Sequence, residues 1–170
     1  TFLAPSRGLI GYQNKFLTDT KGTGVLNRLF NKYDTYKGNI IGRKYGALIS
    51  TDTGSAAAYA IFNLQDRGVM FIGHQTKVYT GMVVGEHSRD NDLEINVIKG
   101  KQLTNVRASG TDEAVRLTPP RNMSLEEMMA YINEDELLEV TPNNLRLRKR
   151  YLSAVERKRD RKSKSSAQSI

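Results

Sequence analysis

One short segment of the sequence, residues 86–92, combines residue types that could support catalysis or metal binding. It consists of Glu-His-Ser-Arg-Asp-Asn-Asp and includes His87, one of only two histidines in the chain. Asp90, Asp92 and Glu94 alternate like the start of a calcium-binding loop, but the glycine and the closing glutamate of such a loop are missing. The competing interpretation, which we favour, is a tight turn between two strands in which Asp and Asn bond their own backbone.

Other signatures of catalysis are absent from the sequence. It contains no G-x4-G-K-[ST] phosphate loop, no G-x-S-x-G elbow and no H-E-x-x-H zinc helix. It has no cysteine, which excludes disulfides and thiolate metal sites and fits a reducing, cytoplasmic setting. No apolar run is long enough to span a membrane. We therefore predict no catalytic residue, no metal site and no cofactor in this chain.

Basic side chains are concentrated near the C-terminus. The formal net charge is +8, and residues 146–164 hold ten Lys or Arg against two acidic residues. Basic runs are usually solvated surface, but this density exceeds what solubility requires and favours phosphate contacts that weaken with salt. The first basic cluster supplies four predicted RNA-binding residues: Arg146, Arg148, Lys149 and Arg150. A second cluster consists of Arg157, Lys158, Arg159, Arg161 and Lys162.

A second candidate RNA-binding segment is the polar stretch at residues 99–112. It is rich in glycine and polar residues and shows no lasting hydrophobic period, so we predict a long loop. Six of its side chains could contact phosphate or sugar oxygens: Lys99, Lys101, Thr104, Asn105, Arg107 and Ser109. The alternative is a solvated connection that carries a few charges. The segment contains no aromatic residue, so base stacking is not expected.

The elements that must position these residues are mostly short strands punctuated by glycine. We predict strands at residues 47–50, 56–64, 70–71, 77–79, 83–87, 93–97 and 114–117. Residues 56–60 could also be helical, although their flanks favour a strand. This spacing of turn signals is typical of a small barrel or sandwich.

Helical patterns flank the strand-rich region. We predict a helix over residues 8–18 capped by Ser6, followed by a strand over residues 25–34. Ser124 and Glu127 have the spacing of a capping box and open an acidic helix within residues 124–139. A short strand should follow at residues 139–140. Residues 153–162 could be helical without an apolar face, and residues 163–170 should be disordered.

Six motifs in this order resemble the C-terminal part of the BipA (TypA) family, with spacing intact over nearly the whole chain. They are SRGLIGY (6–12), TDTKGTG (18–24), LQDRG (64–68), VGEHSRDNDL (84–93), KQLTNVRASGTDEA (101–114) and LRLRKR (145–150). The family is one of bacterial translational GTPases related to elongation factor G. It is associated with ribosome binding, stress adaptation and large-subunit (50S) assembly.

The resemblance implies an α+β fold in three parts. Residues 1–35 would be the last helix and strand of a ferredoxin-like domain similar to domain V of elongation factor G. Residues 36–152 would be the family's small β-barrel domain with flanking helices, and residues 153–170 a basic, disordered tail. Half a ferredoxin-like domain lacks its partner sheet, so we expect residues 1–35 to be less stable than the barrel. The chain begins with Thr1 rather than Met, which suggests a piece of a longer protein.

The resemblance also implies partners. The loop at residues 99–112 corresponds to the family loop that reaches the acceptor end of the A-site tRNA near the peptidyl-transferase region. We therefore expect the 70S ribosome, the 50S subunit, ribosomal RNA and A-site tRNA as partners of a monomeric, cytoplasmic chain. GTP and Mg2+ would be bound by the parent protein's nucleotide-binding domain, so this chain should not be an enzyme.

Two alternatives belong to other classes of function. The chain could be a protein-interaction module that docks through the acidic helix 124–139 on a basic ribosomal protein. It could also be a metal-dependent hydrolase that uses His87 and Asp90, although no ligand cluster in the sequence clearly supplies the metal.

Overall fold

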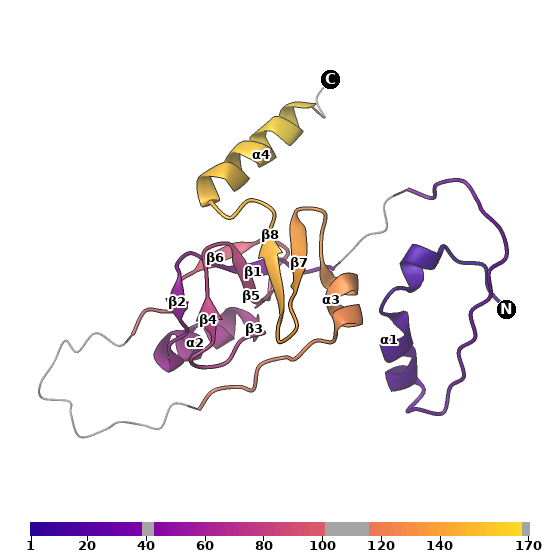
Figure 1. The fold of residues 1–170 in the computed structure, drawn as a ribbon, viewed down its shortest axis with the longest axis horizontal. Coiled ribbons are helices and arrows are strands. Elements are labelled where there is room, and N and C mark those ends of the chain that lie inside the picture. Colours follow the sequence, from indigo (N-terminus) through magenta and orange to yellow (C-terminus); the bar gives the residue numbers. More distant parts are fainter. Residues whose placement is uncertain (39–42, 101–115, 168–170) are drawn as a thin grey trace, which may run out of the picture.

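The computed structural model describes residues 1–38, 43–100 and 116–167, which form an α+β fold and confirm the predicted class (Figure 1). The N-terminal part contains a short 3-10 helix, η1 (Ser6–Leu9), and α1 (Tyr12–Asp19). The central part contains β1 (Ala47–Ser50), β2 (Gly54–Ser55), α2 (Ala58–Leu64), η2 (Gln65–Arg67), β3 (Gly68–Met70), β4 (Lys77–Val78), β5 (Met82–His87) and β6 (Leu93–Ile95). The C-terminal part contains α3 (Leu125–Tyr131), β7 (Glu136–Val140), β8 (Leu145–Lys149) and α4 (Ala154–Ala167).

The main sheet is organised around β5, its longest strand. The sheet has six strands in the order β6-β1-β5-β8-β7, with β3 also paired to β5. Strand β1 pairs with most of β5 along one edge, so β8 and β3 share its other edge. There β8 pairs with Met82–Val83, and β3 pairs with Gly85–His87. All these pairs are antiparallel except β1 with β6. Closure of this sheet into a barrel stays a prediction.

Both faces of the sheet are buried, which explains the continuous apolar runs of β1 and β5. Leu48 and Val84 belong to a core cluster that includes Ile61 of α2 and Val78 of β4. Their strand neighbours Ala47, Ile49 and Val83 belong to a second cluster, with Met128 and Tyr131 of α3. Successive side chains of a strand point to opposite faces, so each of these strands contributes side chains to both clusters. The sheet is therefore covered by α2 and the β2–β4 pair on one face and by α3 on the other.

The predicted strand at residues 56–64 is wrong, because Ala58–Leu64 form helix α2. The helical period places Ala60 and Ile61 in the core and leaves Tyr59 and Phe62 partly exposed. Alanine is the best helix former, so three consecutive alanines favour the helical alternative once the core has a place for that face. Helix α2 thereby covers the core cluster that contains Leu48 and Val84 on one face of the sheet.

The other predicted strands agree with the structure to within a few residues, except the strand predicted at residues 114–117. The strand predicted at 47–50 is β1, and those at 70–71, 77–79, 83–87 and 93–97 correspond to β3, β4, β5 and β6. The strand predicted at 114–117 is not confirmed. Residues 116 and 117 lie outside any strand, and residues 114 and 115 lie outside the described residues.

The N-terminal part differs from the expected helix and strand. The helix is divided at Gly11, whose φ of 74° places it in the left-handed region at the N-cap of α1, so Ser6 does not cap it. Residues 25–34 form no strand, although they are rich in apolar side chains. A strand needs a neighbour for its backbone N–H and C=O groups, and no described strand lies beside this segment.

The C-terminal elements also adjust the predictions. Ser124 and Glu127 form the predicted capping box of α3, but the helix ends at Tyr131 and residues 136–140 pair with β8 as a strand. The acidic helix therefore does not extend to residue 139. The tail predicted to be disordered from residue 163 continues the helix α4 as far as Ala167, and residues 168–170 lie outside the described part. No helix among the described residues is long and apolar enough to cross a membrane.

Candidate nucleic-acid interface

Strand β8 carries the first basic cluster, and it lies directly beside the acidic strand β7. In the antiparallel register Arg148 is opposite Leu137, Arg146 is opposite Glu139, and Lys149 is opposite Glu136. The Arg148 guanidinium bonds the Glu139 carboxylate, with 2.8 Å between Nε and Oε1. Opposite charges across a strand pair stabilise the sheet and cancel one another. Part of the basic cluster therefore neutralises the acidic segment within the fold.

Lys149 is the clearest correction to the predicted interface. Its side chain is 1% exposed, and its ammonium lies 2.6 Å from Asp92, 2.8 Å from Asp135 and 2.8 Å from Glu136. Three carboxylates satisfy its three donors in the interior, so it has no charge to offer to RNA. The alternation of β8 places Lys149 on the same face as Leu147, which is also buried.

Lys149 belongs to a buried ionic network that also contains Arg43. The two guanidinium nitrogens of Arg43 donate to the two Glu136 oxygens at 2.6 and 2.5 Å, and the guanidinium lies 4.4 Å from the centre of the Tyr131 ring. Asp92 accepts from the Ala47 backbone N–H at 2.8 Å. The network therefore connects four parts of the fold: residue 43, the turn that follows β5, strand β7 and strand β8.

The network shifts the pKa values of Lys149, Arg43 and Asp92 toward their charged forms. Burial disfavours the charged Lys149 ammonium, but Glu136, Asp135 and Asp92 outweigh it and raise its pKa. Burial likewise opposes the charged form of Asp92, yet Lys149, the Ala47 N–H and Arg43 together lower its pKa. Lys149, Asp92 and Arg43 therefore stay charged near neutral pH and act as a structural unit rather than an acid–base site.

The other predicted interface residues differ in their exposure. Arg150 is exposed and donates to the Glu134 carbonyl oxygen at 3.0 Å, whereas Arg146 and Arg148 are half-buried. Lys99 is exposed, and its backbone N–H donates to Asn96 Oδ1 at 3.0 Å. The remaining five predictions lie outside the described residues: Lys101, Thr104, Asn105, Arg107 and Ser109.

Helix α4 displays the second basic cluster on its surface. Four of its bases are exposed: Lys158, Arg159, Arg161 and Lys162. The fifth, Arg157, is 6% exposed, because its guanidinium bonds Glu94 at 2.9 Å and the carbonyl oxygens of Tyr151 and Leu152 at 3.0 and 2.5 Å. Arg157 thus fastens the first turn of α4 to β6, and the following turns project from the sheet (Figure 1). Nothing in the local sequence distinguishes Arg157 from its basic neighbours.

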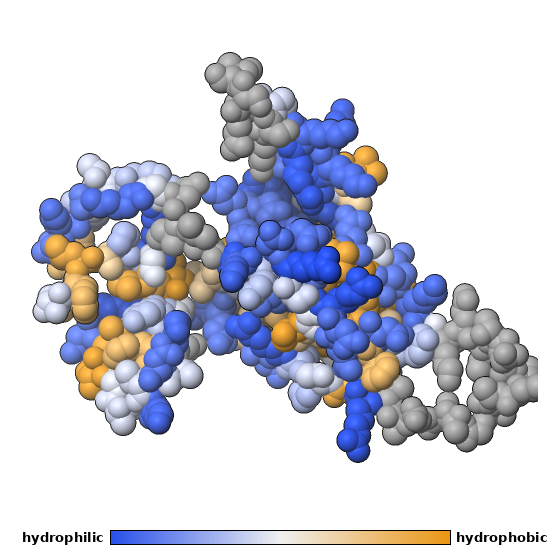
Figure 2. Space-filling view, turned by 180° about the vertical axis from the view of Figure 1, so that it is seen from behind, coloured by the Kyte–Doolittle hydropathy of each residue, from blue (hydrophilic) through white to orange (hydrophobic). Residues whose placement is uncertain are grey.

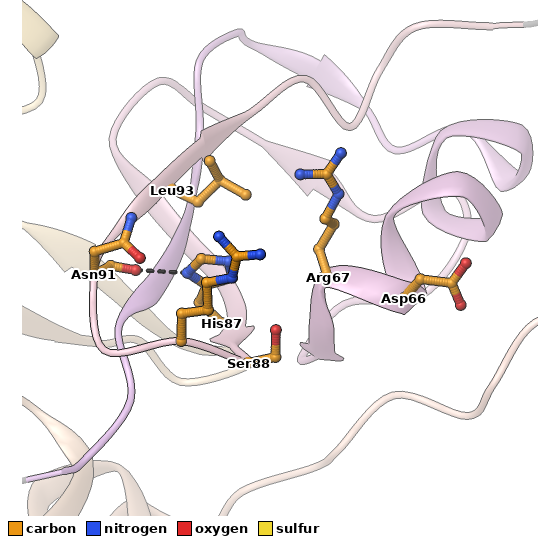
Figure 3. Close-up of a pocket in the computed structure, with 7 residues that line it drawn as sticks. Asp66, Arg67, His87, Ser88, Asn91 and Leu93 are labelled. Atoms are coloured by element: carbon orange, nitrogen blue, oxygen red, sulfur yellow. Dashed lines mark hydrogen bonds between the residues drawn. The ribbon is translucent and has the colours of Figure 1, made fainter.

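The turn at residues 88–92 follows the interpretation that we favoured. His87 Nδ1 lies 2.6 Å from the Asn91 carbonyl oxygen, and the Asn91 amide donates to the Asp92 carbonyl oxygen at 3.3 Å (Figure 3). Asp92 and Glu94 bond Lys149 and Arg157, so these carboxylates are engaged with bases. Among the described residues, no three His, Cys, Asp or Glu side chains converge as a metal site.

The acidic side chains near α3 are also engaged inside the molecule. Glu127 completes the capping box, Glu126 accepts from the Gly11 N–H at 3.3 Å, and Glu136 is fully buried. Glu139 accepts from the Tyr79 hydroxyl at 2.6 Å and forms an ion pair with Arg148. These contacts disfavour the alternative in which an acidic helix docks on a basic protein, because few of its charges remain available.

The fold and its surface define the class of this protein as a small α+β domain with an exposed basic helix. Residues 45–154 match the family model of the TypA/BipA C-terminal domain. The match covers more than half of the chain and contains the whole six-stranded sheet. The chain belongs to the TypA/BipA family.

Curated relatives support this assignment over almost the full chain. The "Large ribosomal subunit assembly factor BipA" of Salmonella typhimurium is 52% identical over 159 residues, which cover 93% of this chain. The protein of the same name from Escherichia coli K12 is also 52% identical over 159 residues, and that from Buchnera aphidicola subsp. Acyrthosiphon pisum is 49% identical over 166 residues. The chain spans 26–27% of the length of these relatives.

Proposed function

We propose that this chain is the ribosome-binding C-terminal region of a BipA-type assembly factor for the large ribosomal subunit. The observation that carries the proposal is the 52% identity, over 93% of the chain, to relatives that are named for this role. In this proposal the chain binds and does not catalyse, acts in the cytoplasm as a monomer, and takes the 50S subunit and the 70S ribosome as partners.

The exposed bases of α4 supply the first proposed contact with ribosomal RNA. Lys158, Arg159, Arg161 and Lys162 lie within five residues on an exposed helix that Arg157 anchors. Phosphate contacts release counterions, so each one adds about 0.7–0.9 to the slope of log affinity against log salt concentration. Four contacts would give a slope of about 3, which a salt series resolves readily.

The loop that begins after Lys99 supplies the second proposed contact. Lys101, Thr104, Asn105, Arg107 and Ser109 remain proposed RNA-binding residues on the basis of their chemistry and the family resemblance. Their proposed partner is the acceptor end of the A-site tRNA. Arg146 and Arg150 would extend the basic surface, whereas the burial of Lys149 removes it from the proposed set.

The rest of the parent protein completes the proposal. We assign GTP and Mg2+ binding, and the GTPase activity that the resemblance implies, to parts of the factor outside this chain. Residues 1–35 would be the closing part of its ferredoxin-like domain, and residues 36–152 the family-specific domain. A role in stress adaptation would belong to the whole factor.

Co-sedimentation with purified 50S subunits and 70S ribosomes, across a series of salt concentrations, tests the proposal. The first variant is Lys158→Glu with Arg159→Glu in α4, and the second is Lys101→Glu with Arg107→Glu in the loop. The matched control is Lys44→Glu with Lys77→Glu, which changes the net charge equally at two exposed sites on other elements.

The proposal expects salt-sensitive binding that both test variants weaken and the control retains. Loss of two phosphate contacts should lower the salt slope by about 1.5. Equal weakening by all three variants would show that binding depends on the net charge of the chain and not on these particular residues. Binding that survives both high salt and the test variants would replace RNA contact by a protein interface.

A further inference from the structure

A pocket of about 380 Å³ lies where the C-terminal end of β5 meets η2 (Figure 3). Its lining includes Arg67 from η2, His87 from β5, and Ser88, Arg89 and Asn91 from the turn that follows. This volume falls in the lower part of the range for small-ligand sites, which is roughly 300–1,000 Å³. None of the lining residues belongs to α4 or to the predicted RNA-binding residues, so the proposed function does not use this pocket.

Gly68 brings the two halves of the pocket together. A Cβ at this position would lie 1.9 Å from the Glu86 carbonyl oxygen, so only glycine allows η2 and β3 to approach β5 this closely. At the same point the Ser88 backbone N–H donates to the Arg67 carbonyl oxygen at 2.9 Å. Arg67 and Arg89, which are far apart in sequence, are thereby held on either side of one pocket.

The turn that carries Arg89 is held as firmly from the other side. The Gly46 N–H donates to the Arg89 carbonyl oxygen at 2.7 Å, and the His87 N–H donates to the Gly46 carbonyl oxygen at 2.8 Å. A Cβ on Gly46 would lie 2.1 Å from the Asn91 carbonyl oxygen, so the fit again requires glycine. The backbone of the pocket is therefore preorganised, which lowers the entropy cost of binding a ligand.

His87 presents one ring nitrogen to this pocket. Its side chain is buried, and Nδ1 lies 2.6 Å from the Asn91 carbonyl oxygen, which can only accept a hydrogen bond. The proton is therefore assigned to Nδ1. Nε2, on the opposite side of the ring, makes no hydrogen bond to any described residue. When the ring carries a second proton, Nε2 donates a hydrogen bond to an oxygen of an anion in the pocket.

The charges of the pocket favour an anion. Within the described part of the chain, the guanidinium groups of Arg67 and Arg89 form no ion pair and no hydrogen bond, and both side chains are exposed. Neither acid of the turn lines the pocket: Asp90 lies outside the lining, and Asp92 is bonded to Lys149 in the interior. Asp66 is the one carboxylate in the lining, and Figure 3 shows it directed away from His87 on the far side of Arg67.

We propose that this pocket binds a phosphate group between Arg67 and Arg89, with Ser88 Oγ and His87 Nε2 as further hydrogen-bonding partners. Guanidinium forks match the geometry of phosphate oxygens, and the pocket offers two of them beside a hydroxyl and an imidazole. The inference deepens the proposed function and rests on it for its source: the phosphate belongs to an RNA backbone. A free phosphate or mononucleotide offers the same chemistry, so the test separates the two.

NMR titration of the chain, labelled with 15N, tests this site directly. The probes are inorganic phosphate and a short single-stranded RNA, and the readouts are the His87 ring nitrogens and the amides of residues 87–92. The test variant is Arg67→Gln with Arg89→Gln, and the matched control is Lys44→Gln with Lys77→Gln. A thermal melt of each variant confirms that the fold is retained.

We expect both probes to shift the His87 signals, with RNA binding tighter than phosphate, and the test variant to weaken both by about tenfold or more. A response to phosphate but not to RNA would support the site and assign it to a small phosphorylated ligand. No shift at His87 with either probe, or equal affinities in the test and control variants, would overturn the proposal. That result would leave the proposed function standing if the chain still sediments with 50S subunits.

Discussion

The N-terminal segment (residues 1–38) and the sheet domain (residues 45–154) contain similar apolar side chains, but these side chains differ sharply in their exposure to solvent. In the sheet domain Leu48 and Val84 are fully buried, whereas Leu29 and Tyr33 in the N-terminal segment are each 93% exposed. Figure 2 shows hydrophobic residues at the surface of the lobe formed by this segment. Burial follows from the presence of covering elements and not from residue type, because a side chain is buried only where another element packs on it.

Gly11 joins the two regions. Gly11 lies against α3, where a Cβ would come within 2.5 Å of the Ala130 Cβ, and its N–H donates to Glu126. Other bonds of the N-terminal segment lie within the segment itself, such as Arg7 to the Gly38 carbonyl oxygen and Lys15 to Asp19. The difference between the regions leads to five predictions.

Hydrogen exchange should separate the two regions by the largest margin. Amides of β1 and β5 are expected to exchange about a thousandfold or more slowly than amides of residues 23–36, because core strands open only with global unfolding. The measurement is native-state exchange followed by mass spectrometry or NMR. Equal protection in both regions would show that the N-terminal segment is as stable as the sheet domain.

The buried network should contribute more than any surface ion pair. Glu136→Ala leaves Arg43 and Lys149 with incomplete partners in the interior and should cost about 3–5 kcal/mol of unfolding free energy. Denaturant unfolding measures this loss. The control, Lys15→Ala, removes an exposed pair in the N-terminal segment and should not move the midpoint. A Glu136→Ala midpoint equal to that of the control would show that the network adds no stability.

Two leucine truncations compare the regions through packing alone. Leu48→Ala opens a cavity between α2 and the sheet and should cost about 2–5 kcal/mol. Leu29→Ala removes an exposed side chain and should change the stability by less than about 0.5 kcal/mol. Both are measured by denaturant unfolding of the whole chain. A large loss for Leu29→Ala would mean that the N-terminal segment packs in solution against a surface of this chain.

The network also makes the stability of the sheet domain depend on pH. Asp92 has an ordinary pKa of 3.8 that is lowered in the fold, so its contribution is complete above that value and is lost as the pH falls through the folded pKa. Asp92→Asn should therefore cost about 1–2 kcal/mol near pH 7 and progressively less below about pH 4. Lys149, with a raised pKa, loses its contribution only as the pH rises beyond 10.5. Unfolding curves from pH 3 to 8 measure the acid limb, and a difference that stays constant over this range would contradict the assignment.

The smallest expected effect concerns helix capping, which α3 has and α1 lacks. Ser124→Ala should cost about 1 kcal/mol, because the hydroxyl accepts from the Glu127 N–H. Glu127→Ala should cost a similar amount, and the double variant less than the sum, since the two side chains form one reciprocal unit. The matched acidic control is Glu134→Ala, at an exposed position beyond the end of α3. Strict additivity of the two losses would argue against a cooperative capping box.

The local part of the fold followed from short-range signals. Strand β1 is an apolar run of the predicted length, and the capping box of α3 rests on two residues three positions apart. Both depend on backbone chemistry within a few residues, which a sequence displays directly. The α+β class, the family and the basic C-terminal surface were predictable for the same reason.

The sequence could not show which elements pack against one another in the fold. It favoured a strand at residues 56–64, with a helix over 56–60 as the alternative, and the packing of Ile61 with Leu48 in one core cluster accompanies a helix. It gave residues 25–34 the pattern of a strand, but no described strand lies beside them.

The same distinction holds for the charged residues. Composition by itself established that residues 146–164 are strongly basic and that the chain suits an anionic partner. Only the tertiary structure decided that Lys149 and Arg157 are interior groups, while Arg67 and Arg89 lie around one pocket. The physical reason is that a charge is available to a partner only if the fold leaves it unpaired and exposed, and pairing joins residues that the sequence keeps far apart.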